Sequence, residues 1–127
     1  MSLTDLLISS DVVSVHCPSN ESTFQLLGAA QFALMKKSAF LINTARGPIV
    51  DEAALVAALE NGEIAGAGLD VYEHEPVVND GLLNRDDVVL LPHLGSATEE
   101  TRSAMATLAA QNAVAIASGG VPLTPVN

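Results

Sequence analysis

The sequence predicts an α/β fold, in which helices flank a parallel sheet of about four strands and a long helix follows toward the C-terminal end. Short apolar runs alternate with segments of helical periodicity, and crossover connections of this kind make the strands parallel. Of the 127 residues, 49% are hydrophobic but only 3% are aromatic, so Ala, Val, Leu and Ile must build the core. This composition suits buried parallel strands that are covered by helices.

The predicted strands are apolar or β-branched runs that are too short to be helices. The first run stops at Cys17-Pro18, because proline removes a backbone donor, and the second stops near Thr44. The predicted strands lie within residues 11–16, 38–44, 64–71 and 88–91.

Two helices are predicted between these strands. Asp51 is a natural N-cap for a helix over residues 52–60, and Asn61-Gly62 supplies its C-terminal stop. Apolar residues at helical spacing predict a further helix over part of residues 24–35.

A longer helix is predicted beyond the last strand. Ser96 and Glu99 have the spacing of a capping box, which predicts a helix that begins at Ser96 and runs to about Ala117. Residues 72–87 are predicted to be a loop, and the tail from Gly119 to be irregular.

The carboxyl ends of parallel strands share one edge of a sheet, and ligands of open α/β sheets bind just beyond that edge. The predicted topology therefore gathers several chemically useful residues at one place. The segments at this edge are Cys17-Pro18, Thr44-Ala45-Arg46, Asp70 to Glu75, and Pro92 to Ser96.

Arg46 is the only cation on the predicted edge. Its planar guanidinium could grip a carboxylate through two parallel hydrogen bonds and polarise an adjacent carbonyl, so it could orient a keto acid. Arg46 could equally well cap nearby carbonyls or pair with Asp51. The residues alone leave these two interpretations evenly matched.

His93 is the strongest acid/base candidate, because it follows a strand and a proline in a turn that Gly95 makes flexible. A single histidine is nevertheless more often structural than catalytic. Glu75 gains a role if it contacts His93, since a carboxylate fixes the imidazole tautomer and favours its protonated form. Otherwise Glu75 belongs to a solvated loop. Asp70 could accept a hydrogen bond from a carboxamide, or it could be a turn residue.

Three other patterns resemble functional motifs but fail on context. Gly66-Ala67-Gly68 lacks the third glycine of a dinucleotide fingerprint and does not open a helix. Ser96 has no G-x-S-x-G elbow around it, which argues against a hydrolase triad. The glutamates beside His74 lack the helical spacing of a zinc site, so no metal site is predicted.

The charge balance narrows the classes of partner. A formal net charge of −10, with no cluster of cations beyond Lys36-Lys37, argues against nucleic acid and against anionic membranes. The single cysteine, Cys17, forms no intrachain disulfide, and no signal sequence or membrane-spanning run is evident. We therefore expect a cytoplasmic protein; residues 1–3 could be an expression leader.

Three ordered motifs together closely resemble the D-isomer-specific 2-hydroxyacid dehydrogenases. They are Ile42 to Asp51 (INTARGPIVD), Ala67 to Pro76 (AGLDVYEHEP) and Leu91 to Thr98 (LPHLGSAT). The resemblance covers about residues 11–122 and includes Val15 to Pro18. It implies an NAD(P)-binding Rossmann-type domain of an oxidoreductase, and the stretch after His93 is closer to the glyoxylate/hydroxypyruvate reductase branch.

The resemblance implies a role for each matching residue. Arg46 would bind the substrate carboxylate and carbonyl, His93 would exchange the proton, and Glu75 would support His93. Asp70 would contact the nicotinamide carboxamide of NAD or NADP. The other residues that would lie along the cofactor are Cys17, Pro18, Thr44, Ala45 and Gly95, together with Arg46 and His93 themselves. The reaction would be hydride transfer between NAD(P)H and a small 2-oxo acid, the reverse oxidising a D-2-hydroxy acid.

The sequence departs from the family where the phosphates would bind. It lacks the strand, G-x-G-x-x-G turn and helix that hold the pyrophosphate, and it lacks the substrate domain. We therefore expect residues 1–127 to be the C-terminal part of the cofactor domain, inactive when isolated, of an enzyme that is a homo-oligomer. The alternative is a non-catalytic module that self-associates through its exposed sheet.

Overall fold

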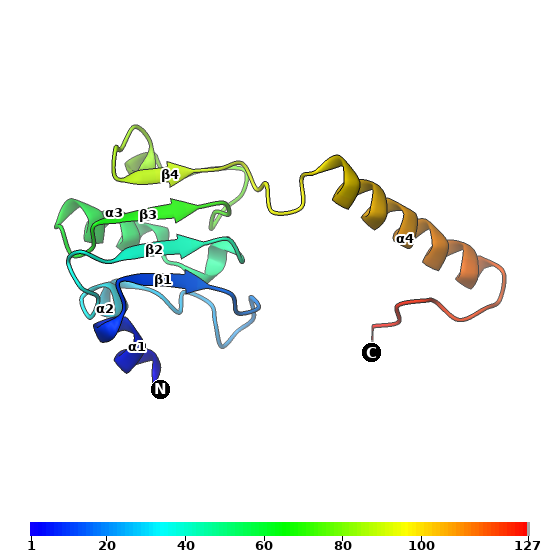
Figure 1. Ribbon diagram of the computed structural model, residues 1–127, viewed down its shortest axis with the longest axis horizontal. Coiled ribbons are helices and arrows are strands. Elements are labelled where there is room, and N and C mark those ends of the chain that lie inside the picture. The colour runs from blue at the N-terminus through cyan, green and yellow to red at the C-terminus, as the bar shows by residue number, and fades with distance from the viewer. Residues whose placement is uncertain (127) are drawn as a thin grey trace. The chain divides into compact units, whose positions relative to one another are not determined.

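The structure is a computed structural model that describes residues 1–126. The chain divides into two compact units, Met1–His93 and Leu94–Asn127. The first unit holds the sheet and nearly all of the predicted site residues, and the second holds the long C-terminal helix (Figure 1).

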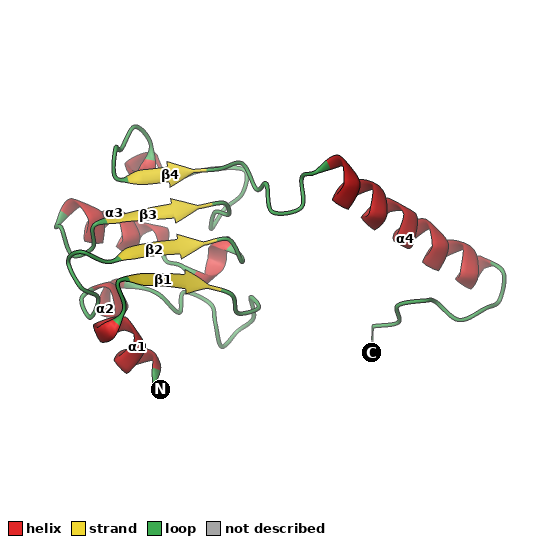
Figure 2. Cartoon of the chain, viewed as in Figure 1, coloured by secondary structure: helices red, strands yellow, loops and turns green. Residues whose placement is uncertain are grey.

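The sheet of the first unit has four parallel strands in the order β1-β2-β3-β4 (Figure 2). The strands are β1 (Val12–Val15), β2 (Phe40–Asn43), β3 (Gly66–Leu69) and β4 (Val88–Leu90). Val12 pairs with Phe40, which pairs with Gly66, and Ala67 pairs with Val88. The predicted fold is confirmed, and all four carboxyl ends lie at one edge of the sheet.

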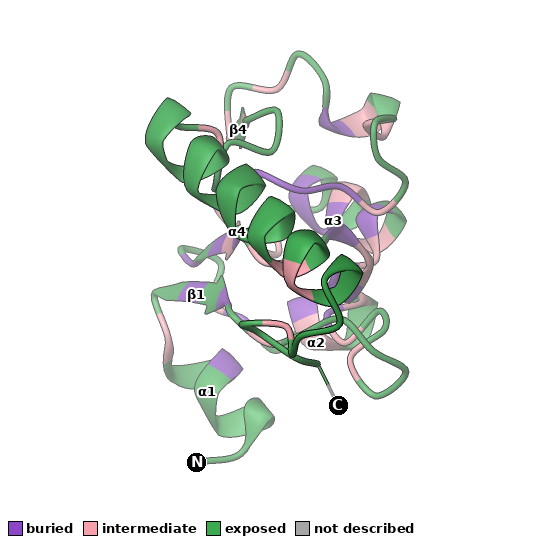
Figure 3. Ribbon diagram, turned by 90° about the vertical axis from the view of Figure 1, so that its right-hand side faces the viewer, coloured by how far each residue is buried: buried purple, intermediate pink, exposed green. Residues whose placement is uncertain are grey.

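Helices cover one face of this sheet, where α2 (Ala29–Phe32) and α3 (Glu52–Glu60) pack on β1 to β3 (Figure 3). Phe32, Leu41 and Leu55 are fully buried in this core. Burial alternates along β1, with Val13 and Val15 buried and Val12 58% exposed. Phe40 and Val89 are exposed on the same face as Val12.

Helix α3 has the predicted bounds, because its signals are local. The Asp51 side chain accepts the Ala54 N–H at 2.9 Å, and Gly62 takes a φ of +63° after the last turn. An additional helix, α1 (Leu3–Ser9), was not predicted. It begins with a capping box between Ser2 and Asp5 and buries Leu7.

Helix α2 is much shorter than the apolar pattern over residues 24–35 suggests. Gln25 has a φ of +46°, and its N–H donates to the Pro48 carbonyl at 2.8 Å. The Leu27 N–H donates in the same way to the Ile49 carbonyl at 3.1 Å. The backbone of residues 25–27 is therefore engaged by a distant segment, and the helix begins only after it.

The second unit consists of α4 (Glu99–Ala117) and the tail that follows it. The predicted start at Ser96 is wrong: Thr98 is the N-cap, and its side chain accepts the Thr101 N–H at 3.2 Å. The tail is irregular as predicted, and Asn112 holds it through hydrogen bonds to the backbone and side chain of Thr124. Within residues 1–126, no helix is long and apolar enough to cross a membrane.

Candidate active site

The candidate site lies at the carboxyl edge of the sheet, in the segments that follow the strands. Arg46 follows β2, Asp70 and Glu75 follow β3, and His93 follows β4. Three strands thus bring residues from distant parts of the sequence to one edge.

Glu75 and His93 form the pair that the sequence suggested. Glu75 Oε2 lies 2.9 Å from His93 Nδ1, and Glu75 Oε1 accepts the Tyr72 N–H at 3.1 Å. The carboxylate is thereby held by its own loop while it contacts the imidazole. Because a carboxylate can only accept a hydrogen bond, His93 Nδ1 carries a hydrogen and donates it to Glu75. Nε2 is then the nitrogen that can exchange a proton with another molecule.

The electrostatics of Glu75 reflect these contacts. The hydrogen bond to His93 is the largest cause that holds the pKa of the Glu75 carboxyl below its ordinary value. Burial is the next largest effect and raises this pKa, whereas the Tyr72 N–H and the charges of His93 and Arg46 lower it further. The charge of Arg46 is the smallest of these effects on the pKa of Glu75.

The His93 backbone has a φ of +56°. This left-handed conformation is uncommon for residues other than glycine and costs on the order of 1–3 kcal/mol.

The neighbouring Tyr72 hydroxyl donates to the Leu91 carbonyl at 2.7 Å and so ties the Glu75 loop to the end of β4. Burial first, and then the charge of Asp70, raise the pKa of Tyr72. No pattern in the sequence predicts the hydrogen bond from Tyr72 to Leu91.

Arg46 is exposed, and its Nη1 donates to the Ala45 carbonyl at 2.6 Å. The turn that carries it is held by Asn43, which is 1% exposed. Asn43 Nδ2 donates to the Arg46 carbonyl at 3.0 Å, and its Oδ1 accepts the Ala45 N–H at 3.1 Å. No ion pair joins Arg46 to Asp51 within residues 1–126. In this conformation Arg46 therefore caps a nearby carbonyl and does not pair with Asp51.

Gly47 fixes how closely the Arg46 turn approaches the Glu75 loop. A Cβ at Gly47 would overlap the carbonyl carbon and oxygen of Tyr72, so no larger residue fits without displacing the backbone. The sequence patterns did not indicate a role for either Gly47 or Asn43. A role for Gly47 could have been suspected, because this glycine directly follows Arg46, the only cation on the predicted edge.

A cavity of about 470 Å³ lies beside Arg46 at the same edge. Its walls contain four of the residues predicted to contact a cofactor, Cys17, Pro18, Ala45 and Arg46. The cavity is also lined by His16 and Ser19. Thr44 is exposed nearby in sequence, but it does not line the cavity.

Asp70 is buried directly after β3, and its N–H donates to the Asn43 carbonyl at 3.0 Å. This hydrogen bond continues the parallel pairing of β2 with β3. Gly95 belongs to the second unit, so its place in a common site stays a prediction.

Comparisons with known proteins identify the family. Residues 1–95 match the family model described as D-isomer specific 2-hydroxyacid dehydrogenase, NAD binding domain. The chain belongs to this family. The predicted family, the Rossmann-type sheet and the assignment to an NAD-binding domain are therefore confirmed.

Individual relatives are reductases. The chain is 53% identical over 126 residues to glyoxylate/hydroxypyruvate reductase B of Klebsiella pneumoniae, covering 98% of this chain and 39% of the reductase. It is 50% identical over 122 residues to glyoxylate reductase of Thermococcus litoralis, covering 96% of this chain and 37% of that enzyme. The chain thus spans less than half of the length of these relatives.

Solved structures show the same fold. The NADPH-dependent glyoxylate/hydroxypyruvate reductase of Sinorhizobium meliloti, in complex with NADP and malonate, superposes with a TM-score of 0.93 at 46% identity, covering 98% of this chain and 39% of that one. D-lactate dehydrogenase of Lactobacillus jensenii with NAD+ gives a TM-score of 0.87 at 34% identity, covering 100% and 42%.

Proposed function

We propose that this chain carries the proton-transfer and substrate-orienting residues of an NAD(P)-dependent 2-hydroxyacid dehydrogenase that acts on glyoxylate or hydroxypyruvate. The observation that carries the proposal is the 2.9 Å contact between Glu75 and His93 at the carboxyl edge of the sheet. The named relatives are glyoxylate and hydroxypyruvate reductases, which supports this substrate class.

His93 would exchange the proton of the reaction. With Nδ1 held by Glu75, Nε2 can donate a proton to the carbonyl oxygen of a 2-oxo acid as that oxygen gains negative charge. In the oxidising direction the same nitrogen accepts the hydroxyl proton. Glu75 is ionised at neutral pH and stabilises the imidazolium that is needed before reduction.

Arg46 would bind the substrate. Its exposed guanidinium can form two parallel hydrogen bonds with the substrate carboxylate and polarise the neighbouring carbonyl. Leaving its contact with the Ala45 carbonyl would free one donor for this purpose. The net charge of −10 makes this local cation important, since the rest of the surface repels an anionic acid.

The residues present fit part of a dinucleotide. The cavity lined by Cys17, Pro18 and Ala45 offers walls of mixed polar and apolar character at the edge where such ligands bind. NAD or NADP would supply or accept the hydride at this edge. Asp70 would accept a hydrogen bond from the nicotinamide carboxamide, and Thr44 and Gly95 would lie along the cofactor.

We further propose that residues 1–127 correspond to the C-terminal part of the cofactor domain and that the complete enzyme is a cytoplasmic homo-oligomer. The match to 39% of the Klebsiella reductase supports the first statement. The isolated chain would then bind NADH weakly and reduce neither glyoxylate nor hydroxypyruvate. Calorimetry with NADH and an absorbance assay test this, and clear turnover would contradict it.

A chimeric enzyme tests the function itself. This chain would replace its counterpart in the Sinorhizobium reductase, to which it is 46% identical with a TM-score of 0.93. We expect the chimera to reduce glyoxylate or hydroxypyruvate with NADPH. A folded chimera that binds NADPH but reduces neither acid would contradict the proposal.

A second candidate function is self-association without catalysis. It is favoured by the apolar side chains on one sheet face, where Val12 is 58%, Phe40 47% and Val89 63% exposed. Burial of such a face against a second copy would be favourable. Light scattering of the 127-residue chain tests this candidate: concentration-dependent dimers would support it, and a monomer at all concentrations would exclude it. The chimeric enzyme tests catalysis independently of this result.

A further inference from the structure

Glu52 is a buried carboxylate for which the proposed chemistry has no use. It is the first residue of α3 and only 7% exposed. It forms part of the wall of a cavity of about 350 Å³ that is separate from the cavity beside Arg46. A carboxylate is costly to bury unless it accepts hydrogen bonds, so its partners indicate why it is there.

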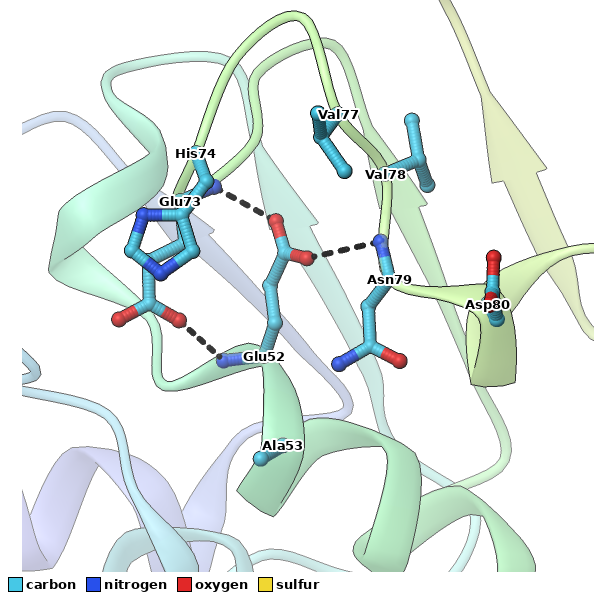
Figure 4. A pocket seen from close by; sticks show the side chains of 8 residues that line it. All are labelled: Glu52, Ala53, Glu73, His74, Val77, Val78, Asn79 and Asp80. Carbon is cyan, nitrogen blue, oxygen red and sulfur yellow. Dashed lines mark hydrogen bonds between the residues drawn. The ribbon is translucent and has the colours of Figure 1, made fainter.

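Glu52 accepts hydrogen bonds from two backbone groups that lie far from it in sequence. Its Oε1 accepts the Glu73 N–H at 2.6 Å, and its Oε2 accepts the Asn79 N–H at 3.3 Å (Figure 4). In return, the Glu52 N–H donates to Glu73 Oε2 at 3.2 Å. Glu73 Oε1 accepts a further hydrogen bond from Gln25 at 2.8 Å.

The two anchored groups stand at the two ends of one loop, residues 73–79. Inside this loop, the Val77 N–H donates to the His74 carbonyl at 3.0 Å and closes a tight turn. Glu75 lies in that turn and contacts His93. One side chain on α3 therefore fastens both ends of the loop that presents Glu75.

We propose that Glu52 is a positioning residue: its carboxylate holds the loop of residues 73–79 in the conformation in which Glu75 meets His93. This role acts through Glu75, and its importance for catalysis rests on the function proposed above. Glu52 does not touch the reacting groups.

A simpler explanation is that Glu52 stabilises α3, since carboxylates are favourable in the first turn of a helix. Asp51 already caps this end of α3 through the Ala54 N–H. Interaction with the helix end also gives no reason for Glu52 to accept N–H groups from residues 73 and 79. The two explanations differ in what happens at Glu75.

Glu52→Gln separates them in the 127-residue chain. Glutamine keeps the shape of the side chain, but its NH₂ group cannot accept an N–H, so one of the two loop hydrogen bonds is lost. We expect the amide of Glu73 or Asn79 to exchange its hydrogen about tenfold faster, as loss of a hydrogen bond to a charged group implies. The pKa of Glu75 should rise toward its ordinary value, because the contact with His93 that lowers it is weakened.

Both quantities are measured by NMR, from amide exchange and from the titration of the Glu75 side-chain carboxyl carbon. Glu60→Gln is the matched control, because it removes the same charge from an exposed position on the same helix. The control should leave the exchange at residues 73 and 79 and the Glu75 titration unchanged. A folded Glu52→Gln variant with lower stability but an unchanged Glu75 titration would overturn the proposal.

If Glu52→Gln does not fold, amide exchange in the unsubstituted chain still tests the proposal. The amides of Glu73 and Asn79 should then both exchange more slowly than unprotected amides, and unprotected exchange at both would overturn the proposal. None of these measurements needs catalysis. If they succeed while His93→Gln leaves the chimeric reductase fully active, the positioning role stands and the proposed function fails.

Discussion

The side chains of Glu75 and His93 meet at 2.9 Å although 18 positions separate them in the sequence. The contact joins the loop after β3 to the end of β4 at the edge of the sheet. Tyr72 supports it from both sides, because its N–H donates to Glu75 and its hydroxyl donates to the Leu91 carbonyl. The site is therefore a product of strand order and loop fastening together.

The Glu75–His93 contact predicts how stability depends on pH. The pKa of the Glu75 carboxyl is lowered on folding, chiefly by the hydrogen bond to His93. Its contribution to stability is therefore fully present above the ordinary glutamate pKa, 4.5, and is lost as the pH falls through the lower folded value. The side chain is 37% exposed, so solvent screening keeps this contribution small.

NMR titration of Glu75, with urea unfolding at several pH values, measures this effect. Glu75→Gln should flatten the part of the acid dependence that Glu75 contributes. A Glu75 carboxyl that titrates at its ordinary value would show that the hydrogen bond is absent in solution.

Gly47→Ala should destabilise the fold. The added Cβ overlaps the Tyr72 carbonyl, which is backbone and cannot rotate away, so we expect a loss of about 2–3 kcal/mol in the free energy of unfolding. Gly28→Ala is the control, since a Cβ there meets only ordinary contacts at 3.7 and 3.9 Å. Urea unfolding compares the two, and equal losses would contradict the close approach.

Arg46→Lys should weaken catalysis in the chimeric reductase without weakening the fold. Lysine keeps the charge but loses the planar pair of donors, so we expect kcat/KM for glyoxylate to fall about 100-fold. Lys37→Ala is the control, because it removes an exposed cation away from the carboxyl edge. Steady-state kinetics with glyoxylate makes the comparison. A fall in kcat/KM of less than about threefold for Arg46→Lys would contradict two-point binding of the substrate carboxylate by Arg46.

Self-association predicts a specific effect on the exposed sheet face. Replacing both Phe40 and Val89 with Ser should shift any concentration-dependent dimer toward monomer, because these side chains are 47% and 63% exposed on that face. Phe24→Ser is a matched control, since Phe24 is 58% exposed but lies outside the sheet. Light scattering over a range of concentrations gives the readout, and equal effects would argue against this face.

The elements that could be predicted from the sequence are those with local signals. Asp51 and Gly62 bracket α3, and the strands end where prolines and polar residues interrupt apolar runs. The carboxyl edge follows from the parallel connections, which is why Arg46, Glu75 and His93 could be placed at one edge from the sequence.

Features that depend on distant contacts could not be predicted. Helix α2 is short because Gln25 and Leu27 bond to the backbone of residues 48 and 49. Glu52 looks like an ordinary first-turn glutamate, although its partners lie 21 and 27 residues away. The left-handed φ of His93 likewise has no local sequence signal.

The predicted helix start at Ser96 was wrong for a different reason. Ser96 and Thr98 both carry hydroxyls suited to an N-cap, and the spacing to Glu99 favoured the first. The structure selects Thr98, whose hydroxyl also donates to the Thr101 hydroxyl at 2.8 Å. Two competing caps within one turn cannot be ranked by spacing alone.

The most direct test of the account is the rate of the chimeric reductase after His93→Gln. Glutamine can still contact Glu75, but it cannot exchange the proton, so kcat/KM for glyoxylate should fall by about 100-fold to 10,000-fold while NADPH binding stays within about threefold. A variant that keeps its kcat/KM within about twofold, over the same pH range, would contradict the assignment of His93 as the acid and base of this site.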